Sequence, residues 1–154
     1  KTDFVLQKCT EIGVTNFYPM ITMRTVVDIR GKEKNRQDRW QRIVNDASKQ
    51  SKSTFIPTVH YPIEITGVFD KIYKNDFSIV PYEGEKRTTI KQALDHYNGG
   101  DINIFIGPEG GFDDIEIKAL TRAGIRSVSL GEKILRAETA SMVTLVNIIY
   151  ELDL

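Results

Sequence analysis

The feature that most constrains the fold lies in the last third of the chain, where a short apolar run leads into a glycine-rich turn and a capped helix. Residues 102–106 read INIFI, residues 107–112 read GPEGGF, and Asp113 has Glu116 three positions later. Such a short apolar run is typical of a buried strand in a parallel sheet, and the Asp–Glu pair forms a capping box. The segment predicts a strand–turn–helix unit whose helix runs to about Ala123 and stops at Gly124.

The same alternation of strand and helix patterns continues along the chain and predicts an α/β fold: an open, mostly parallel sheet with helices on both faces. A length of 154 residues suits one domain, so we expect residues 1–154 to share one core. Period-2 or short apolar patterns predict strands at residues 17–22, 58–61, 77–80, 102–106 and 128–130. Apolar residues at helical spacing predict helices at residues 4–12, 36–51, 63–73, 89–97, 113–123 and around 142–149.

The charge balance limits how the chain can bind nucleic acid. Lys and Arg number 21, and so do Asp and Glu, so bulk electrostatic attraction to nucleic acid is not expected. One local basic stretch stands out, made of Arg30, Lys32, Lys34, Arg36, Arg39 and Arg42. It is equally compatible with RNA contact and with a solvated linker that continues into a charged helix face.

Cysteine and histidine usage argues against disulfide or metal chemistry. Cys9 is the only cysteine, which suits a reducing cytoplasm, and we expect it to be a small buried hydrophobe. His60 and His96 lack metal-ligand spacing, so we expect no metal. No apolar run is long enough to span a membrane. These observations favour a cytoplasmic location.

Two loops near the C-terminus are candidates for a binding site. Residues 107–112 follow one predicted strand and residues 129–140 follow the next. Ligands of open α/β sheets bind beyond the carboxyl ends of the strands, but a tight turn without a ligand explains the first loop equally well. Neither the dinucleotide fingerprint nor the P-loop motif is present. In the second loop Leu130, Ile134 and Leu135 either line a slot for an adenine and a thioether chain or close the edge of the core.

Two charged residues of the second loop are also open to two interpretations. Glu138 lies where a carboxylate offsets the dipole of the C-terminal helix. Arg136 could form a surface pair with a glutamate, or it could bind an anion.

Taken together, several motifs resemble the RsmE family of RNA methyltransferases, which belongs to the SPOUT class. Residues 107–112 (GPEGGF) and 129–140 (SLGEKILRAETA) match two motifs of that family in the same order. Residues 7–14 (QKCTEIGV) are similar to its QKATELGV opening, and residues 46–51 (DASKQS) to its EAxEQS segment. The resemblance covers essentially the whole chain.

The resemblance implies a SPOUT fold with a C-terminal trefoil knot, a homodimer, and S-adenosylmethionine bound in a bent shape. It also implies methylation of N3 of a uridine in 16S ribosomal RNA of the small ribosomal subunit. Residues 81–83 are expected to form a third wall of the pocket. The residues expected to hold the cofactor are Pro81, Gly107, Pro108, Glu109, Gly110, Gly111, Leu130, Gly131, Ile134, Leu135, Arg136 and Thr139.

For catalysis we expect Arg136 to stabilise negative charge on the base or to hold a phosphate. We expect Glu138 either to accept the proton of the base or to act only on the helix dipole. RNA contact is expected from Arg30, Lys32, Arg36 and Arg39.

Two features depart from the family pattern. Family members carry an N-terminal RNA-binding barrel resembling a PUA domain, and we expect it to be absent from this chain. Ser53 stands where the family usually has an arginine, so that arginine's role is not carried over. Two alternatives stay open at this point: another SPOUT methyltransferase acting on transfer RNA, and a non-catalytic RNA-binding or dimerisation module.

Overall fold

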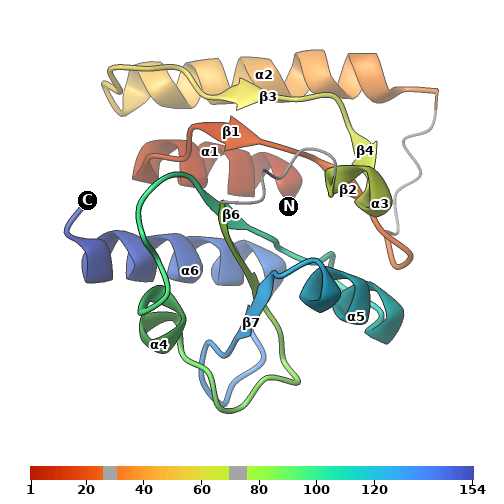
Figure 1. The fold of residues 1–154 in the computed structure, drawn as a ribbon. Coiled ribbons are helices and arrows are strands. Elements are labelled where there is room, and N and C mark those ends of the chain that lie inside the picture. Colours follow the sequence, from red (N-terminus) through yellow and green to blue (C-terminus); the bar gives the residue numbers. More distant parts are fainter. Residues whose placement is uncertain (26–30, 70–75) are drawn as a thin grey trace.

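The computed structural model describes residues 1–25, 31–69 and 76–154. The helices are α1 (Thr2–Ile12), α2 (Glu33–Gln50), α3 (Ile65–Val68), α4 (Ile90–Leu94), α5 (Asp114–Arg122) and α6 (Ala137–Leu152). The strands are β1 (Asn16–Phe17), β2 (Met20–Ile21), β3 (Thr58–Val59), β4 (Ile63–Glu64), β5 (Phe77–Pro81), β6 (Ile102–Ile104) and β7 (Arg126–Val128). Figure 1 shows their arrangement.

Every strand pair in the described part of the chain is parallel. Strand β5 lies in the middle of a three-stranded sheet, with β6 on one side and β7 on the other. Two shorter ladders join β1 to β3 and β2 to β4. Because parallel neighbours need crossover connections, α2 lies between β1 and β3 in the sequence, and α4 between β5 and β6. The predicted α/β class and mostly parallel sheet are confirmed.

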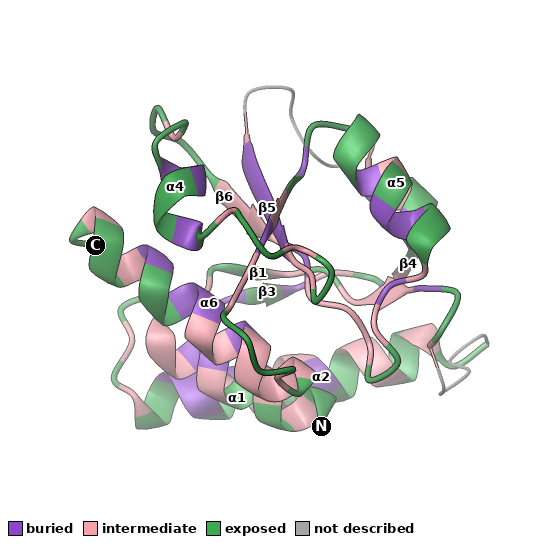
Figure 2. Ribbon diagram, turned by 90° about the horizontal axis from the view of Figure 1, so that it is seen from below, coloured by how far each residue is buried: buried purple, intermediate pink, exposed green. Residues whose placement is uncertain are grey.

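Helices cover both faces of the central sheet, as Figure 2 shows for α5 on one side and α4 and α6 on the other. Successive side chains of a strand point to opposite faces, and β5 supplies both cores. Val80 packs with residues of α3 and α5, whereas Ile79 packs with residues of α4 and α6. The predicted placement of helices on both faces is therefore confirmed.

A further layer is built from α1 and α2. Leu6 of α1 packs with Trp40 and Val44 of α2 and with Val59 of β3. Helix α1 lies between α2 and α6, so it joins this layer to the rest of the molecule (Figure 1). It ends at Gly13, whose positive φ of 121° closes the helix with backbone hydrogen bonds to Cys9 and Thr10. This end agrees with the prediction.

Three predicted helices differ in extent from the structure. Helix α2 begins at Glu33 rather than at residue 36, because its first turn is polar and carries no apolar signal. Residues 63–73 were predicted as one helix, but Ile63–Glu64 forms strand β4 beside β2, and only Ile65–Val68 is helical. Tertiary pairing overrides helical spacing at that point, and residues 70–73 lie outside the described part. Helix α4 ends at Leu94, three residues before the predicted end.

The strand ends that lead to the site also differ slightly from the prediction. Strand β6 stops at Ile104, and its three residues are only half-buried, while the next residue, Phe105, is buried. Strand β7 stops at Val128, so Leu130 lies in the loop that follows it. The capping box of Asp113 and Glu116 forms as predicted. The C-terminal trefoil knot stays a prediction.

Candidate active site

The loops that follow β5, β6 and β7 meet around a cavity of about 440 Å³. Parallel strands bring their carboxyl ends to one edge of a sheet, so loops from distant parts of the sequence converge there. Ten residues predicted to bind a cofactor line this cavity: Pro81, Gly107, Pro108, Glu109, Gly111, Leu130, Gly131, Ile134, Leu135 and Arg136. Tyr82 and Glu83 also line it, so residues 81–83 form a third wall, where the sequence placed them.

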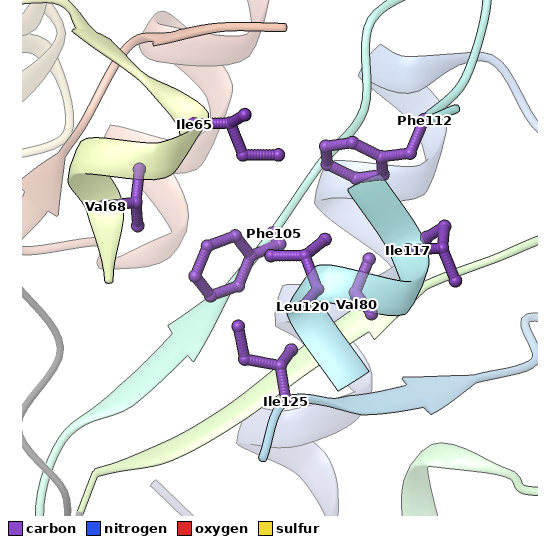
Figure 3. Close-up of a cluster of buried hydrophobic side chains, with 8 residues drawn as sticks. All are labelled: Ile65, Val68, Val80, Phe105, Phe112, Ile117, Leu120 and Ile125. Atoms are coloured by element: carbon purple, nitrogen blue, oxygen red, sulfur yellow. The ribbon is translucent and has the colours of Figure 1, made fainter. Parts of the chain in front are cut away.

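The loop at residues 107–112 is shaped by contacts that only glycine allows. A Cβ atom on Gly107 would lie 3.2 Å from the backbone nitrogen and from the ring of Phe112. Phe112 is only 5% exposed and packs with Ile117 and Leu120 beneath the loop (Figure 3). Gly111 adopts a positive φ of 69° and donates a backbone hydrogen bond to the carbonyl of Pro108 at 2.9 Å. The loop is therefore closed on itself and anchored in the core.

The second loop leaves β7 and presents apolar side chains to the cavity. Ser129 forms an isolated parallel bridge with Thr89, which fixes the start of the loop. Gly131 has a φ of 108°, a conformation that other residues rarely adopt. Ile134 is 79% exposed and Leu135 is half-buried, although both are apolar. Exposed apolar side chains at the rim of a cavity are typical of a site that binds a partly apolar ligand.

Three residues predicted for the site do not line the cavity. Helix α6 contributes Ala137 and Ala140, which lie three positions apart on one helix face, and Glu138 and Thr139 are not among the residues that line the cavity. Gly110 lies against the aliphatic part of Arg24, about 3.4 Å from where a Cβ would stand. The predictions placed these residues by their position in a motif, which does not reveal the direction of a side chain.

Six lining residues were missed: Lys1, Ile106, Phe112, Lys133, Ala137 and Ala140. Ile106 and Phe112 flank the glycine turn, and the two alanines follow from the 3.6-residue period of α6, so the sequence held a signal for these four. Lys133 lies within a loop already singled out. No local pattern marks Lys1, because it is brought to the cavity by the packing of α1 against α6.

Charged groups of both signs surround the apolar part of the cavity. The Nζ atom of Lys1 lies 3.5 Å from Oε1 of Glu109. The backbone N–H of Glu109, and then the charge of Lys1, lower the pKa of the Glu109 carboxyl. Glu83 reaches the neighbourhood of Gly111, and Lys133 and Arg136 add exposed cations. This arrangement suits a ligand that combines an apolar body with groups of both charges.

Two groups bear on which side chain could react. Burial raises the pKa of the Cys9 thiol to about 11, so Cys9 is no ready nucleophile. Oε2 of Glu138 is buried and has no hydrogen-bond partner among the described residues. A buried carboxylate oxygen without a donor is unfavourable, so Oε2 of Glu138 retains the capacity to accept a hydrogen bond.

The predicted basic stretch is only partly available for RNA. Lys32 is exposed at the start of α2, and Arg36 is half-buried. Arg39 donates to the carboxylate of Asp3, which offsets its charge. Arg30 lies outside the described residues. Ser53, in place of the family's arginine, donates through its hydroxyl to the carbonyl of Phe55 at 2.8 Å.

Neither a metal-binding cluster nor a membrane-spanning helix occurs among the described residues. Residues 1–25, 31–69 and 76–154 contain no cluster of three or more His, Cys, Asp and Glu side chains suited to a metal ion. Across the same three ranges, every helix is too short or too polar to cross a bilayer.

Comparison with known proteins agrees with the geometry. The family model described as "RNA methyltransferase domain" matches residues 1–149. Ribosomal RNA small subunit methyltransferase E from Synechocystis is 34% identical over 146 residues, which are 94% of this chain and 47% of that protein. The protein of the same name from Bacillus subtilis is 30% identical over 162 residues, covering 100% of this chain and 62% of the relative.

A solved structure shows the same fold. The crystal structure of ribosomal RNA small subunit methyltransferase E from Neisseria gonorrhoeae, bound to S-adenosyl methionine, matches with a TM-score of 0.85 and 31% identity. The match covers 96% of this chain and 60% of that chain, and the chain spans less than two thirds of the length of each of these relatives. With the site geometry and a family model that matches nearly every residue, the chain belongs to the RNA methyltransferase domain family and resembles the methyltransferase E proteins within it.

Proposed function

We propose that this chain is the catalytic domain of an enzyme that uses S-adenosylmethionine to methylate N3 of a uridine in 16S ribosomal RNA. The observation that carries the proposal is the cavity lined by residues 81–83, 107–109, 111–112, 130–131 and 133–136 at the carboxyl ends of three parallel strands. Its volume of about 440 Å³ lies within the usual range for small-molecule sites. Relatives named ribosomal RNA small subunit methyltransferase E support methyl transfer to small-subunit ribosomal RNA.

The cavity residues fit the proposed cofactor. Ile106, Leu130 and Leu135 supply an apolar surface for an adenine ring, and Gly107 and Gly111 allow close approach of the backbone. The carboxylates of Glu83 and Glu109 can accept hydrogen bonds from ribose hydroxyls or an ammonium group. Lys1 and Lys133 can pair with a carboxylate. When bound, S-adenosylmethionine supplies an electrophilic methyl group on its sulfonium.

Arg136 is the residue best placed to act on the nucleotide. It caps α6 at the rim of the cavity and is exposed, so its guanidinium can reach a bound base or phosphate. A uridine N3 carries a proton that must leave when the nitrogen is methylated. A guanidinium beside the base stabilises the negative charge that develops on its oxygens, and a preorganised donor of this kind is worth roughly 100-fold in rate.

Glu138 is the proposed acceptor of the N3 proton. Its buried and unpaired Oε2 supports this role, because an unsatisfied carboxylate has capacity for a proton or a donor. Its place outside the cavity lining favours the competing role at the dipole of α6. The pH dependence of a Glu138→Gln variant separates the two: a base gives a changed profile, and a dipole role leaves it unaltered.

RNA contact is proposed for the basic stretch that includes Lys32 and Arg36. Because these contacts would be electrostatic, a Lys32→Glu variant should weaken RNA binding more at low salt than at high salt.

We also propose a homodimer that uses α6, since Val146 and Tyr150 are 48% and 78% exposed on this largely apolar helix. Sedimentation equilibrium measures the dimer. The reduced Cys9 and an RNA substrate support a cytoplasmic location.

The first test is calorimetry with S-adenosylhomocysteine, which needs no RNA. We expect binding to wild type. Absence of heat and of any thermal shift at saturating ligand would contradict the proposal. The result would favour the alternative of a non-catalytic RNA-binding or dimerisation module.

The second test is methyl transfer to small ribosomal subunits and to transfer RNA, with the product nucleoside identified by mass spectrometry. Arg136→Ala should lower kcat/KM roughly 100-fold. The matched control, Arg122→Ala, removes an exposed arginine at the end of α5 and should leave the rate unchanged. If transfer RNA but not the small ribosomal subunit were methylated, the proposal of a ribosomal RNA substrate would be wrong.

A further inference from the structure

The segment after β2 is joined to the loop at residues 107–112 by the side chain of Arg24, and to the cap of α5 by that of Glu116. Neither side chain lines the cavity. We propose that Arg24 is a positioning residue that holds this loop in the shape that binds the cofactor. The proposal rests on the proposed function for its ligand, but the contacts that carry it are intramolecular.

The guanidinium of Arg24 joins the loop to the helix that follows it. Nη1 donates to the carbonyl oxygen of Gly110 at 2.9 Å, and Nη2 donates to Oδ2 of Asp113 at 3.1 Å. The two acceptors lie at the end of the glycine turn and at the cap of α5. Because the guanidinium is planar and rigid, these two bonds fix the direction of the Gly110 carbonyl relative to the helix.

The aliphatic part of Arg24 adds a steric restraint. Its Cβ and Cδ atoms lie 3.4 and 3.5 Å from where a Cβ of Gly110 would stand, so its stem covers that glycine. Gly110 is therefore held on its outer side, while Glu109 and Gly111, its neighbours in the chain, face the cavity. A shift of the Gly110 peptide would move both neighbours.

A buried carboxylate fixes Arg24 itself. Glu116 is 5% exposed, its Oε1 accepts the backbone N–H of Met23 at 2.7 Å, and its Oε2 accepts that of Asp113 at 2.8 Å. Both oxygens are thus used to join the residue before Arg24 to the cap of α5. The turn is closed further by Thr22, whose backbone N–H donates to Oγ1 of Thr25 at 2.9 Å.

The physical consequence is preorganisation. A loop already held in its binding conformation loses less entropy when a ligand binds, so its affinity is higher. Charge-assisted bonds such as those of Arg24 are the stronger kind of hydrogen bond.

The test compares Arg24→Met with wild type. Methionine keeps an aliphatic stem over Gly110 but removes both hydrogen bonds, and the exposed position of Arg24 favours normal folding. We expect the Kd for S-adenosylhomocysteine to rise about tenfold, and Arg24→Lys to give an intermediate value. In turnover, KM for S-adenosylmethionine should rise while kcat at saturation changes less than about twofold. Lys91→Met, which removes the ion pair with Glu151, is the matched control and should leave Kd unchanged.

Hydrogen exchange without ligand separates this proposal from the proposed function. The backbone amides of residues 107–112 should exchange faster in Arg24→Met than in wild type or Lys91→Met. If wild type failed to bind the cofactor analogue but the exchange difference were present, the proposed function would fall and the positioning role would stand. Unchanged exchange, or an unchanged Kd beside normal wild-type binding, would overturn the role of Arg24.

Discussion

The layer formed by α1 and α2 and the three loops around the cavity are held in place by different interactions. In the layer, regular helices bury Leu6, Trp40 and Val44 against each other, and the shape follows from apolar spacing. In the loops, the shape depends on glycine backbone conformations and on contacts with distant segments, such as that of Gly110 with Arg24. Substitutions in the layer should therefore change stability alone, and substitutions in or beneath the loops should also change binding.

The largest expected effect is on stability, and it comes from the core beneath the loops. Leu120→Ala should lower the free energy of unfolding by about 3 kcal/mol, because Leu120 is completely buried in the cluster that includes Phe112 (Figure 3). It should also weaken binding of S-adenosylhomocysteine several-fold. Val44→Ala, equally buried but in the α1–α2 layer, should cost about 2 kcal/mol and leave the affinity unchanged. Denaturant unfolding measures the stability of both variants, and calorimetry measures their affinity. Equal effects of the two variants on affinity would contradict the difference between the loops and the α1–α2 layer.

Two glycine-to-alanine substitutions, one in the first loop and one in α3, test the same comparison with a single added methyl group. Gly107→Ala places a Cβ 3.2 Å from the Phe112 backbone, so either the loop or Phe112 must shift. We expect at least a tenfold loss of affinity for S-adenosylhomocysteine. Gly67→Ala, in α3, meets nothing within 4 Å and should raise stability by about 0.5–1 kcal/mol with unchanged affinity. A Gly107→Ala variant that binds like wild type would show that the loop adapts freely.

The smallest expected effect concerns the charge at the cap of α5. The backbone N–H of Ile115, and then Arg24, lower the pKa of Asp113. Its stabilisation is therefore complete above the ordinary carboxyl pKa of about 4 and is lost as the pH falls through the lower folded-state value. Asp113→Asn keeps a capping side chain without the charge. Its unfolding temperature should therefore be lower than that of wild type at pH 7 and equal to it in acid.

The corresponding cap of α4 has no ionisable side chain and is the control. Thr89→Ala should cost about 1 kcal/mol at every pH between 3 and 7. Thermal unfolding followed by circular dichroism measures both variants. A deficit for Asp113→Asn that did not depend on pH would contradict the electrostatic role of Asp113.

The predictions from sequence succeeded where a local rule applies. Gly13 ends α1, and Asp113 with Glu116 caps α5, because helix ends are determined by a few neighbouring residues. They failed at Ile63 and Glu64, where pairing of Ile63 with Met20 produces a strand instead of a helix. Pairing partners that lie 43 positions away in the numbering leave no trace in a local pattern.

The site shows the same division. Gly107, Leu130 and Leu135 belong to motifs at strand ends and line the cavity. Thr139 and Gly110 belong to the same motifs but do not line it, and their contact with a cofactor stays a prediction. Lys1 and the positioning contacts of Arg24 were missed, since both depend on how α1 and β2 pack against the C-terminal half.

The amino-acid sequence by itself determined the alternation of elements, the helix caps and the two glycine loops, because each depends on interactions within about four residues. Only the tertiary structure decided that these loops enclose one cavity, that Arg24 joins the β2 turn to the first loop, and that Glu116 joins that turn to the cap of α5. The physical reason is that parallel strands align their carboxyl ends in space whatever their separation in the chain.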